Sequence, residues 1–167
     1  MNNKLIANKN LIKFILLSFI FQSCNLGSGT HGFIKSYEFP ISKYKLENGV
    51  DSVMKKNKNI QPDNKIGFYN DAENYLTFVI NKDSFSFEYT IRYLGDKTDW
   101  DISSKSEIFI CYIFDEKGTS GGSVGDEKFM ETPVKMRADM INIFESEFVN
   151  KIDRELNVKH DNIDGVN

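Results

Sequence analysis

The segment SFSFEYTIRY, residues 84–93, alternates apolar and polar side chains without a break. A period of two over this length predicts a β-strand with one buried face and one solvated face. The buried face would hold Phe85, Phe87, Tyr89, Ile91 and Tyr93, and the solvated face Ser84, Ser86, Glu88, Thr90 and Arg92. The apolar run LTFVI (76–80) precedes it across the short polar link NKD (81–83), which predicts an antiparallel hairpin.

Two further strands are predicted around this hairpin. The run EIFICYIFD (107–115) is apolar on both faces, which is typical of a strand at the centre of a sheet. Strict alternation would place Ile108, Ile110, Tyr112 and Phe114 opposite Phe109, Cys111 and Ile113. A first strand is expected from Phe33 to Phe39, ended by Pro40.

Helical spacing appears twice. Ser42 is a suitable N-cap for a helix that runs to Lys56, with Leu46, Val50, Val53 and Met54 on one side. Gly49 inside this helix indicates either close packing against a strand or simple tolerance. The pair Thr132 and Pro133 predicts the start of a helix of about 22 residues, with threonine as N-cap. Its apolar stripe would be Ile141, Phe144, Phe148, Ile152 and Leu156.

These elements predict an α+β fold, with an antiparallel sheet of three to five strands and two helices packed on one face. No repeat and no break in composition divides residues 33–157, so we expect a single domain there. The polar tail from 158 to 167 has little apolar surface to bury and is expected to be disordered.

The N-terminal residues have the pattern of a secretory signal peptide. Lys4, Lys9 and Lys13 give positive charge, and residues 14–21, apolar except for Ser18, follow. This run is far shorter than the ~20 residues that a membrane-spanning helix needs. The signal peptide would comprise residues 1–23.

The end of this segment resembles the lipobox, the processing site of bacterial lipoproteins. Phe21 is apolar, Ser23 is small, and Cys24 follows directly. The resemblance implies that Cys24 becomes the N-terminus and carries a diacylglycerol and an acylated amine, so that the partner is the lipid bilayer. By analogy with other lipoproteins, Asn25 in place of aspartate favours the outer membrane. The alternatives are a buried N-terminal strand, or an ordinary signal peptide with an incidental cysteine.

Residues 24–32 would then be the lipidated cysteine and a flexible tether, since NLGSGTHG (25–32) is small and polar. Removal of residues 1–23 from the 167 leaves a chain of 144 residues. The three lysines leave with it, so 18 basic residues face 24 acidic ones, a net charge of −6. This balance argues against binding to nucleic acid.

Few residues indicate chemistry. The glycine-rich run GTSGGSVG (118–125) lacks the lysine of a phosphate-binding loop and is followed by two acids, so we interpret it as a connecting loop. Cys111 has no partner once Cys24 is acylated, and burial explains a free thiol best. The sequence predicts no catalytic residue, no cofactor and no metal site; the only histidines are His31 and His160.

One acidic segment stands out as a candidate partner-binding site. Asp96, Asp99 and Asp101 lie close together, and Trp100, the single tryptophan, stands among them. The three carboxylates lack the glycine and final glutamate of a twelve-residue calcium loop. Trp100 would either cover a sheet edge or form an exposed anchor for a basic protein partner.

Three functional hypotheses follow. The first is a non-catalytic, membrane-anchored binding or protective protein, of the immunity or inhibitor kind, in the bacterial envelope. The second is an envelope hydrolase that uses Asp96, Asp99 or Asp101. The third is a structural subunit of an outer-membrane assembly. The first and the third share every sequence feature described above.

Overall fold

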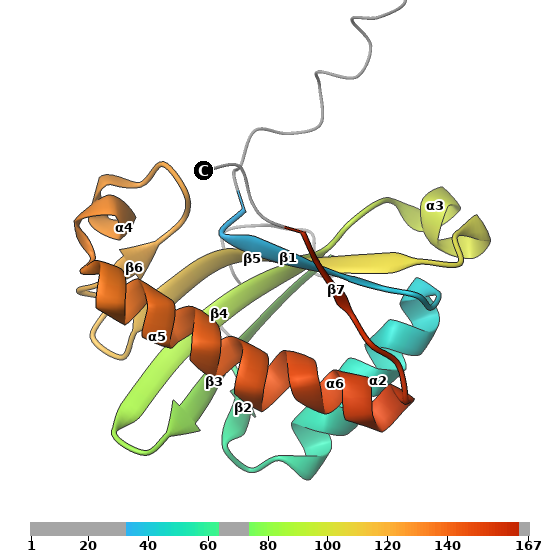
Figure 1. Ribbon diagram of the computed structural model, residues 1–167, viewed down its shortest axis with the longest axis horizontal. Coiled ribbons are helices and arrows are strands. Elements are labelled where there is room, and N and C mark those ends of the chain that lie inside the picture. Colours follow the sequence, from blue (N-terminus) through green and yellow to red (C-terminus); the bar gives the residue numbers. More distant parts are fainter. Residues whose placement is uncertain (1–32, 64–73, 164–167) are drawn as a thin grey trace, which may run out of the picture. The chain divides into compact units, whose positions relative to one another are not determined.

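The computed structural model describes residues 33–63 and 74–163. They form an α+β fold around a seven-stranded antiparallel sheet (Figure 1). Its strands are β1 (Lys35–Phe39), β2 (Ile60–Pro62), β3 (Tyr75–Lys82), β4 (Phe85–Tyr93), β5 (Ser106–Asp115), β6 (Gly121–Gly122) and β7 (Asp161–Ile163). The order across the sheet is β2-β3-β4-β5-β1-β7, and β6 pairs with β5. The sheet exceeds the three to five strands expected, because β2, β6 and β7 are too short for a periodic pattern.

The hairpin expected from residues 76–93 is confirmed. β3 and β4 pair from Tyr75 opposite Arg92 to Lys82 opposite Phe85, and Asp83 turns the chain with a φ of 52°. The residues of β4 that face the core are buried: Phe87, Tyr89, Ile91 and Tyr93. Phe85 is the exception at 43% exposed, because it lies at the end of the strand, beside the turn.

The central place of β5 is confirmed, but the expected distribution of its side chains is wrong. β5 lies between β4 and β1. A bulge interrupts its pairing with β4, since Thr90 faces Tyr112 whereas Ile91 faces Ile110. The extra residue is Cys111, and it shifts the alternation by one position. Ile113 therefore lies in the same core as Ile108 and Ile110.

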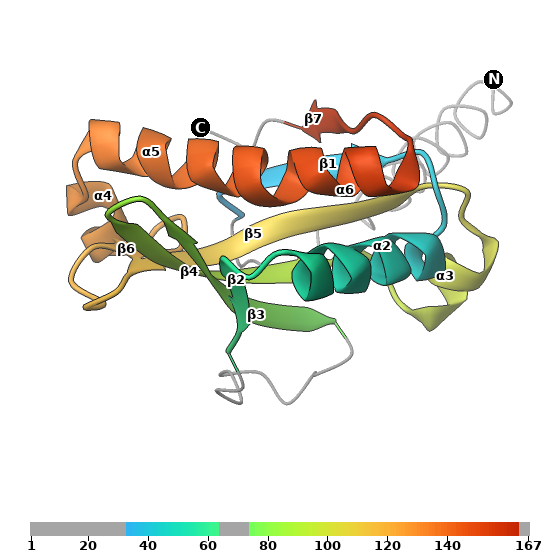
Figure 2. The same cartoon turned by 90° about the horizontal axis from the view of Figure 1, so that it is seen from below.

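Two helical segments cover one face of the sheet (Figures 1 and 2). The first is α2 (Lys43–Lys56), which buries Leu46, Val50 and Val53 as its spacing predicts. The second runs through α5 (Val134–Phe144), a π-helical turn (Glu145–Val149) and α6 (Asn150–Leu156). The short helices are α3 (Lys97–Ile102) and α4 (Glu127–Glu131).

The π-helical turn keeps the apolar stripe of the long segment aligned. Phe144, Phe148 and Ile152 are all fully buried. Steps of four residues drift by about 40° per step on a helix of 3.6 residues per turn. The wider π turn rotates less per residue and offsets this drift.

The expected N-cap of the long helix is wrong. Pro133 takes the N-cap position of α5, and Thr132 closes α4 instead. The hydroxyl of Thr132 donates to the Lys128 carbonyl at 2.9 Å and accepts from the Gly121 N–H at 2.9 Å. A buried threonine with these two partners ties β6 to α4.

The expectation of a disordered tail is wrong for residues 158–163. Asn157 ends α6 in the left-handed conformation, with a φ of 52°, and the chain returns as β7 to pair with β1. His160 holds this return, since its Nδ1 lies 2.8 Å from Asp153 Oδ2. The imidazole also packs against the rings of Tyr37 and Phe39.

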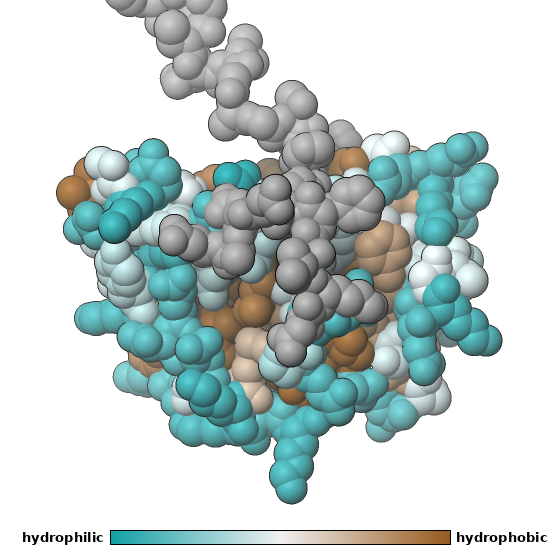
Figure 3. Space-filling view, turned by 180° about the vertical axis from the view of Figure 1, so that it is seen from behind, coloured by the Kyte–Doolittle hydropathy of each residue, from teal (hydrophilic) through white to brown (hydrophobic). Residues whose placement is uncertain are grey.

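The opposite face of the sheet carries neither long helical segment within the described residues (Figures 2 and 3). We call it the helix-free face and define it by three rows across β3, β4 and β5: Tyr75, Arg92 and Phe109; Thr77, Thr90 and Tyr112; and Val79, Glu88 and Phe114. The polar residues of β4 were expected to be solvated here. They are half-buried, because aromatic and apolar side chains of β3 and β5 flank them.

Residues 1–32 lie outside the described part, and so do the expected signal peptide, Cys24 and the tether. Within the described residues, every helix is too short or too polar to cross a bilayer.

Candidate functional site

The acidic segment with Asp96, Asp99 and Asp101 forms the short helix α3 and its N-cap. Asp96 is its N-cap, and its carboxylate accepts from the backbone N–H groups of Thr98 at 2.8 Å and Asp99 at 3.2 Å. Asp99 returns the interaction, since its Oδ2 accepts from the Asp96 N–H at 3.0 Å. This reciprocal arrangement is a capping box. Two of the three candidate carboxylates therefore start the helix.

The third carboxylate connects α3 to α2. Asp101 accepts a hydrogen bond from the hydroxyl of Tyr44 at 3.0 Å. This hydrogen bond and the charge of Asp101 raise the pKa of the exposed Tyr44 phenol. Each of the three carboxylates thus has a structural contact: Asp96 and Asp99 form the helix cap, and Asp101 bonds to Tyr44 of α2.

Trp100 covers the end of the sheet, the first of its two expected alternatives. Trp100 is only 8% exposed, and its Nε1–H donates to the Leu94 carbonyl at 2.8 Å. The ammonium of Lys43, from α2, lies over the ring. The premise of an exposed aromatic anchor is therefore not met.

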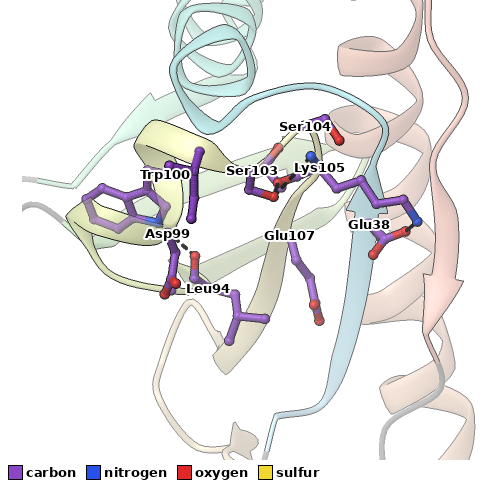
Figure 4. A pocket seen from close by; sticks show the side chains of 11 residues that line it. Glu38, Leu94, Asp99, Trp100, Ser103, Ser104, Lys105 and Glu107 are labelled. Atoms are coloured by element: carbon purple, nitrogen blue, oxygen red, sulfur yellow. Dashed lines mark hydrogen bonds and ion pairs between the residues drawn. The ribbon is translucent and has the colours of Figure 1, made fainter.

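A cavity of about 590 Å³ opens beside Trp100, between α3 and the adjoining ends of β1 and β5 (Figure 4). Its polar lining comes from the segment Ser103–Glu107 and from Glu38 and Asp99. Leu94 and Ile102 line it as well and are 51% and 81% exposed. The cavity therefore combines an apolar wall with charged groups.

Carboxylates dominate the charge of this cavity. Its charged lining residues in the described part of the chain are the acids Glu38, Asp99 and Glu107 and one base, Lys105. Lys105 forms an ion pair with Glu38. The hydrogen bond from Lys105 and the charge of Glu38 raise the pKa of that ammonium. Three acids against one base leave a formal charge of −2.

The register of β1 and β5 explains why the acids meet. Glu38 lies directly opposite Glu107 in the antiparallel pair. Figure 4 shows Glu107 between Leu94 and the Lys105–Glu38 pair. Like charges directly opposite each other are destabilising, and Lys105 offsets this repulsion. Glu107 lines the cavity and has no ion pair within the described residues.

Sequence reasoning missed Glu38, Lys105 and Glu107. Each is a single charged residue in or next to a strand, and nothing local distinguishes it from an ordinary surface charge. They come together only because β1 pairs with β5. The sequence does not show which residues pair between two strands that lie 60 or more residues apart.

The other sequence candidates have structural roles. In the glycine-rich loop, Asp115 accepts hydrogen bonds from the N–H and the hydroxyl of Thr119, and Asp126 accepts one from the Ser123 N–H. Two N–H groups of this loop are therefore already paired with carboxylates of the chain. Burial raises the pKa of the Cys111 thiol to about 12, although the charge of Arg92 partly opposes this. Across residues 33–63 and 74–163, no three His, Cys, Asp or Glu side chains are grouped to hold a metal ion.

Comparisons of the chain with protein-family models, with curated proteins and with solved structures found no match.

Proposed function

We propose that this protein is a lipid-anchored, non-catalytic binding protein of the bacterial envelope, of the immunity or inhibitor kind. Its partner would be a basic protein that inserts a lysine or arginine side chain into the cavity beside α3. Acylated Cys24 would hold it in the membrane, and we favour the outer membrane. The observation that carries the binding proposal is the cavity itself, in which Glu107 lies beside an apolar wall.

The chemistry of the lining supports a basic ligand. A long cationic side chain has an aliphatic stem and a charged head. Leu94 and Ile102 can pack against the stem, and Glu107 can accept hydrogen bonds from the head. A charge-assisted hydrogen bond of this kind is roughly twice as strong as a neutral one.

Charge also supports the choice of partner. The chain without residues 1–23 has a net charge of −6, so its field would attract a basic protein and accelerate the encounter. Such attraction weakens as ionic strength rises. Binding through Glu107 should therefore be sensitive to salt.

The binding test is capture of a stoichiometric partner from the host's envelope and secreted fractions. Glu107→Lys reverses the charge of the cavity and should abolish capture, whereas Glu116→Lys on an exposed loop makes the same charge change elsewhere. Trp100→Ala is less informative, because it removes a buried side chain. Equal capture by both variants would refute the cavity as the binding site.

Two results would support the alternatives. Turnover of an envelope substrate that needs calcium or magnesium and is lost in Asp99→Asn would favour a hydrolase. Stable co-purification with an outer-membrane complex, unaffected by Glu107→Lys, would favour a structural subunit.

The anchor is tested separately. Cys24→Ala should move the protein out of the membrane fraction. Equal fractionation of both forms as soluble protein would refute lipidation at Cys24.

A further inference from the structure

Two acids of the cavity belong to a longer row that reaches the last strand of the sheet. Glu38 of β1 lies directly opposite Glu107 of β5 on one side and directly opposite Asp161 of β7 on the other. Residues that lie directly opposite each other in antiparallel strands project from the same face of the sheet. We call Glu107, Glu38 and Asp161 the acidic row. Figure 4 shows β7 (red) beside β1 (blue), on the side away from β5.

The acidic row is only partly neutralised by the chain itself. Lys105 forms an ion pair with Glu38, the middle member. The hydrogen bond with Glu38 and the charges of Glu38 and Asp161 raise the pKa of the Lys105 ammonium, so Asp161 acts on the same cation. Within the described residues, no ion pair includes Glu107 or Asp161. Three acids and one base give the row a formal charge of −2, and the two acids without an ion pair stand at its ends.

Both ends of the row are open to solvent. Glu107 is half-buried and lines the cavity beside α3. Asp161 is exposed and lies on β7, the last strand in the order of the sheet. The row therefore runs from the inside of the cavity to the edge of the sheet, where a partner can reach it.

The spacing of the row suits two cationic groups rather than one. Neighbouring strands lie about 4.8 Å apart, so Glu107 and Asp161 stand about 10 Å apart, on the two sides of the Lys105–Glu38 pair. An extended peptide projects side chains i and i+2 to the same side, about 6.8 Å apart. The long stems of lysine and arginine can splay to cover the remaining distance. A single cationic side chain in the cavity would leave the carboxylate of Asp161 uncompensated.

We propose that the acidic row extends the binding site from the cavity to β7, and that the basic partner binds it through an extended segment with two basic residues. One cationic side chain enters the cavity at Glu107, and the second contacts Asp161. Lys105 stays on Glu38 between them. The inference rests on the proposed function, because it assumes that the cavity takes a cationic side chain.

The test titrates two synthetic peptides into the full chain, purified in a non-ionic detergent. The dibasic peptide is acetyl-Gly-Arg-Ser-Arg-Gly-amide. In the monobasic peptide, citrulline, a neutral isostere of arginine, replaces the second arginine. Isothermal titration calorimetry gives the dissociation constants. We expect the wild type to bind the dibasic peptide about fivefold more tightly, as one additional exposed ion pair would allow.

Four variants locate the second contact. Asp161→Asn should remove the difference between the peptides without changing the affinity for the monobasic one, whereas Glu107→Gln should weaken the binding of both. Asp161→Glu keeps the charge and should keep the difference, which guards against a general effect of substitution in β7. Glu131→Gln removes an exposed charge from α4, at the other end of the sheet from α3 (Figure 1), and should change neither affinity.

The outcomes separate this inference from the proposed function. Equal affinity of the wild type for the two peptides would overturn the acidic row as a contact surface, and so would equal effects of Asp161→Asn and Glu131→Gln. In either case, weaker binding by Glu107→Gln would still support the cavity as a site for a cationic side chain. Binding of neither peptide would refute the cavity as such a site and the acidic row with it.

Discussion

The ammonium of Lys43 lies 3.3 Å from the centre of the Trp100 ring, so that α2 holds α3 against the end of the sheet. Lys43 is only 4% exposed and also pairs with Glu47 on its own helix. A cation–π contact removed from water contributes about 2 kcal/mol. Trp100 lines the proposed binding cavity, and Lys43 does not. Lys43 therefore supports one wall of the cavity through its contact with the Trp100 ring.

Lys43→Met should therefore lower the free energy of unfolding by about 1–2 kcal/mol and change the fluorescence of Trp100, the only tryptophan. Lys45→Met on the exposed side of the same helix is the matched control and should change neither. Urea denaturation followed by tryptophan fluorescence measures both quantities. Identical behaviour of the two variants would mean that the contact contributes nothing.

The sign of the effect of Gly49→Ala should depend on Leu156. A Cβ at position 49 would lie 2.5 Å from Leu156 Cδ1 and 2.7 Å from its Cγ, so Gly49 allows α2 to approach α6 closely. The partner is thus a helix rather than the strand considered from the sequence. We expect Gly49→Ala to destabilise the wild type by about 1–3 kcal/mol through overpacking.

In a Leu156→Ala background the same substitution should be neutral or stabilising by up to about 1 kcal/mol, because alanine is the better helix former. Chemical denaturation of the four variants in this cycle measures the difference. Equal effects in both backgrounds would show that the two residues do not interact.

Phe87→Asp and Phe85→Asp should have very different effects on folding. Phe87 is 2% exposed and faces the core, whereas Phe85, two residues earlier on the same strand, is 43% exposed. A buried carboxylate without partners costs several kcal/mol, so Phe87→Asp should unfold the domain. Phe85→Asp should cost less than about 1 kcal/mol. Circular dichroism on heating distinguishes these outcomes, and wild-type stability of Phe87→Asp would contradict the assignment of the faces.

Stability should fall in acid through Glu147. Burial alone raises the pKa of this carboxyl, but hydrogen bonds from Lys151, Lys82 and Asn59 and the charge of Lys151 outweigh it and lower the pKa from 4.5 to about 2. Because the folded-state pKa lies below the unfolded value, the stabilisation is complete above about pH 4.5 and is lost as the pH falls towards 2.

Glu147→Gln should therefore destabilise the protein at pH 7 and much less at pH 2.5. Glu131→Gln, at an exposed position, provides the comparison at each pH. Urea denaturation at the two pH values gives the free energies. A constant difference between Glu147→Gln and wild type would refute the ionic contribution.

Local periodicity predicted the parts of the fold that depend on local sequence. The alternation at 84–93 and the stripe from Ile141 to Leu156 each fix which side is buried, because neighbouring residues in the element share the signal. The bulge at Cys111 leaves no such signal, since an apolar run looks the same in either register. The strand β7 depends on contacts of His160 with Asp153, Tyr37 and Phe39 that only the folded chain brings together.

The candidate site was likewise predictable only in the part that local sequence determines. The sequence indicated the segment with Asp96, Asp99 and Trp100, and the cavity does lie beside it. It left open whether Trp100 covers a sheet edge or is exposed, and it gave no indication that Asp96 and Asp99 cap a helix. Glu107, a carboxylate in the cavity, belongs to β5, whose neighbour β1 lies at the start of the domain sequence.

The place of β1 between β5 and β7 has a consequence for the order of folding. The hairpin of β3 and β4 closes through a short turn, but β1 pairs with β5 and β7, which are synthesised much later. Contacts of long sequence separation form slowly. If the chain is secreted with its N-terminus first, as proposed, its first strand stays unpaired until its last residues have crossed. We expect pulsed hydrogen exchange during refolding to show protection of β4 amides before β1 amides, and simultaneous protection of both strands would contradict this order.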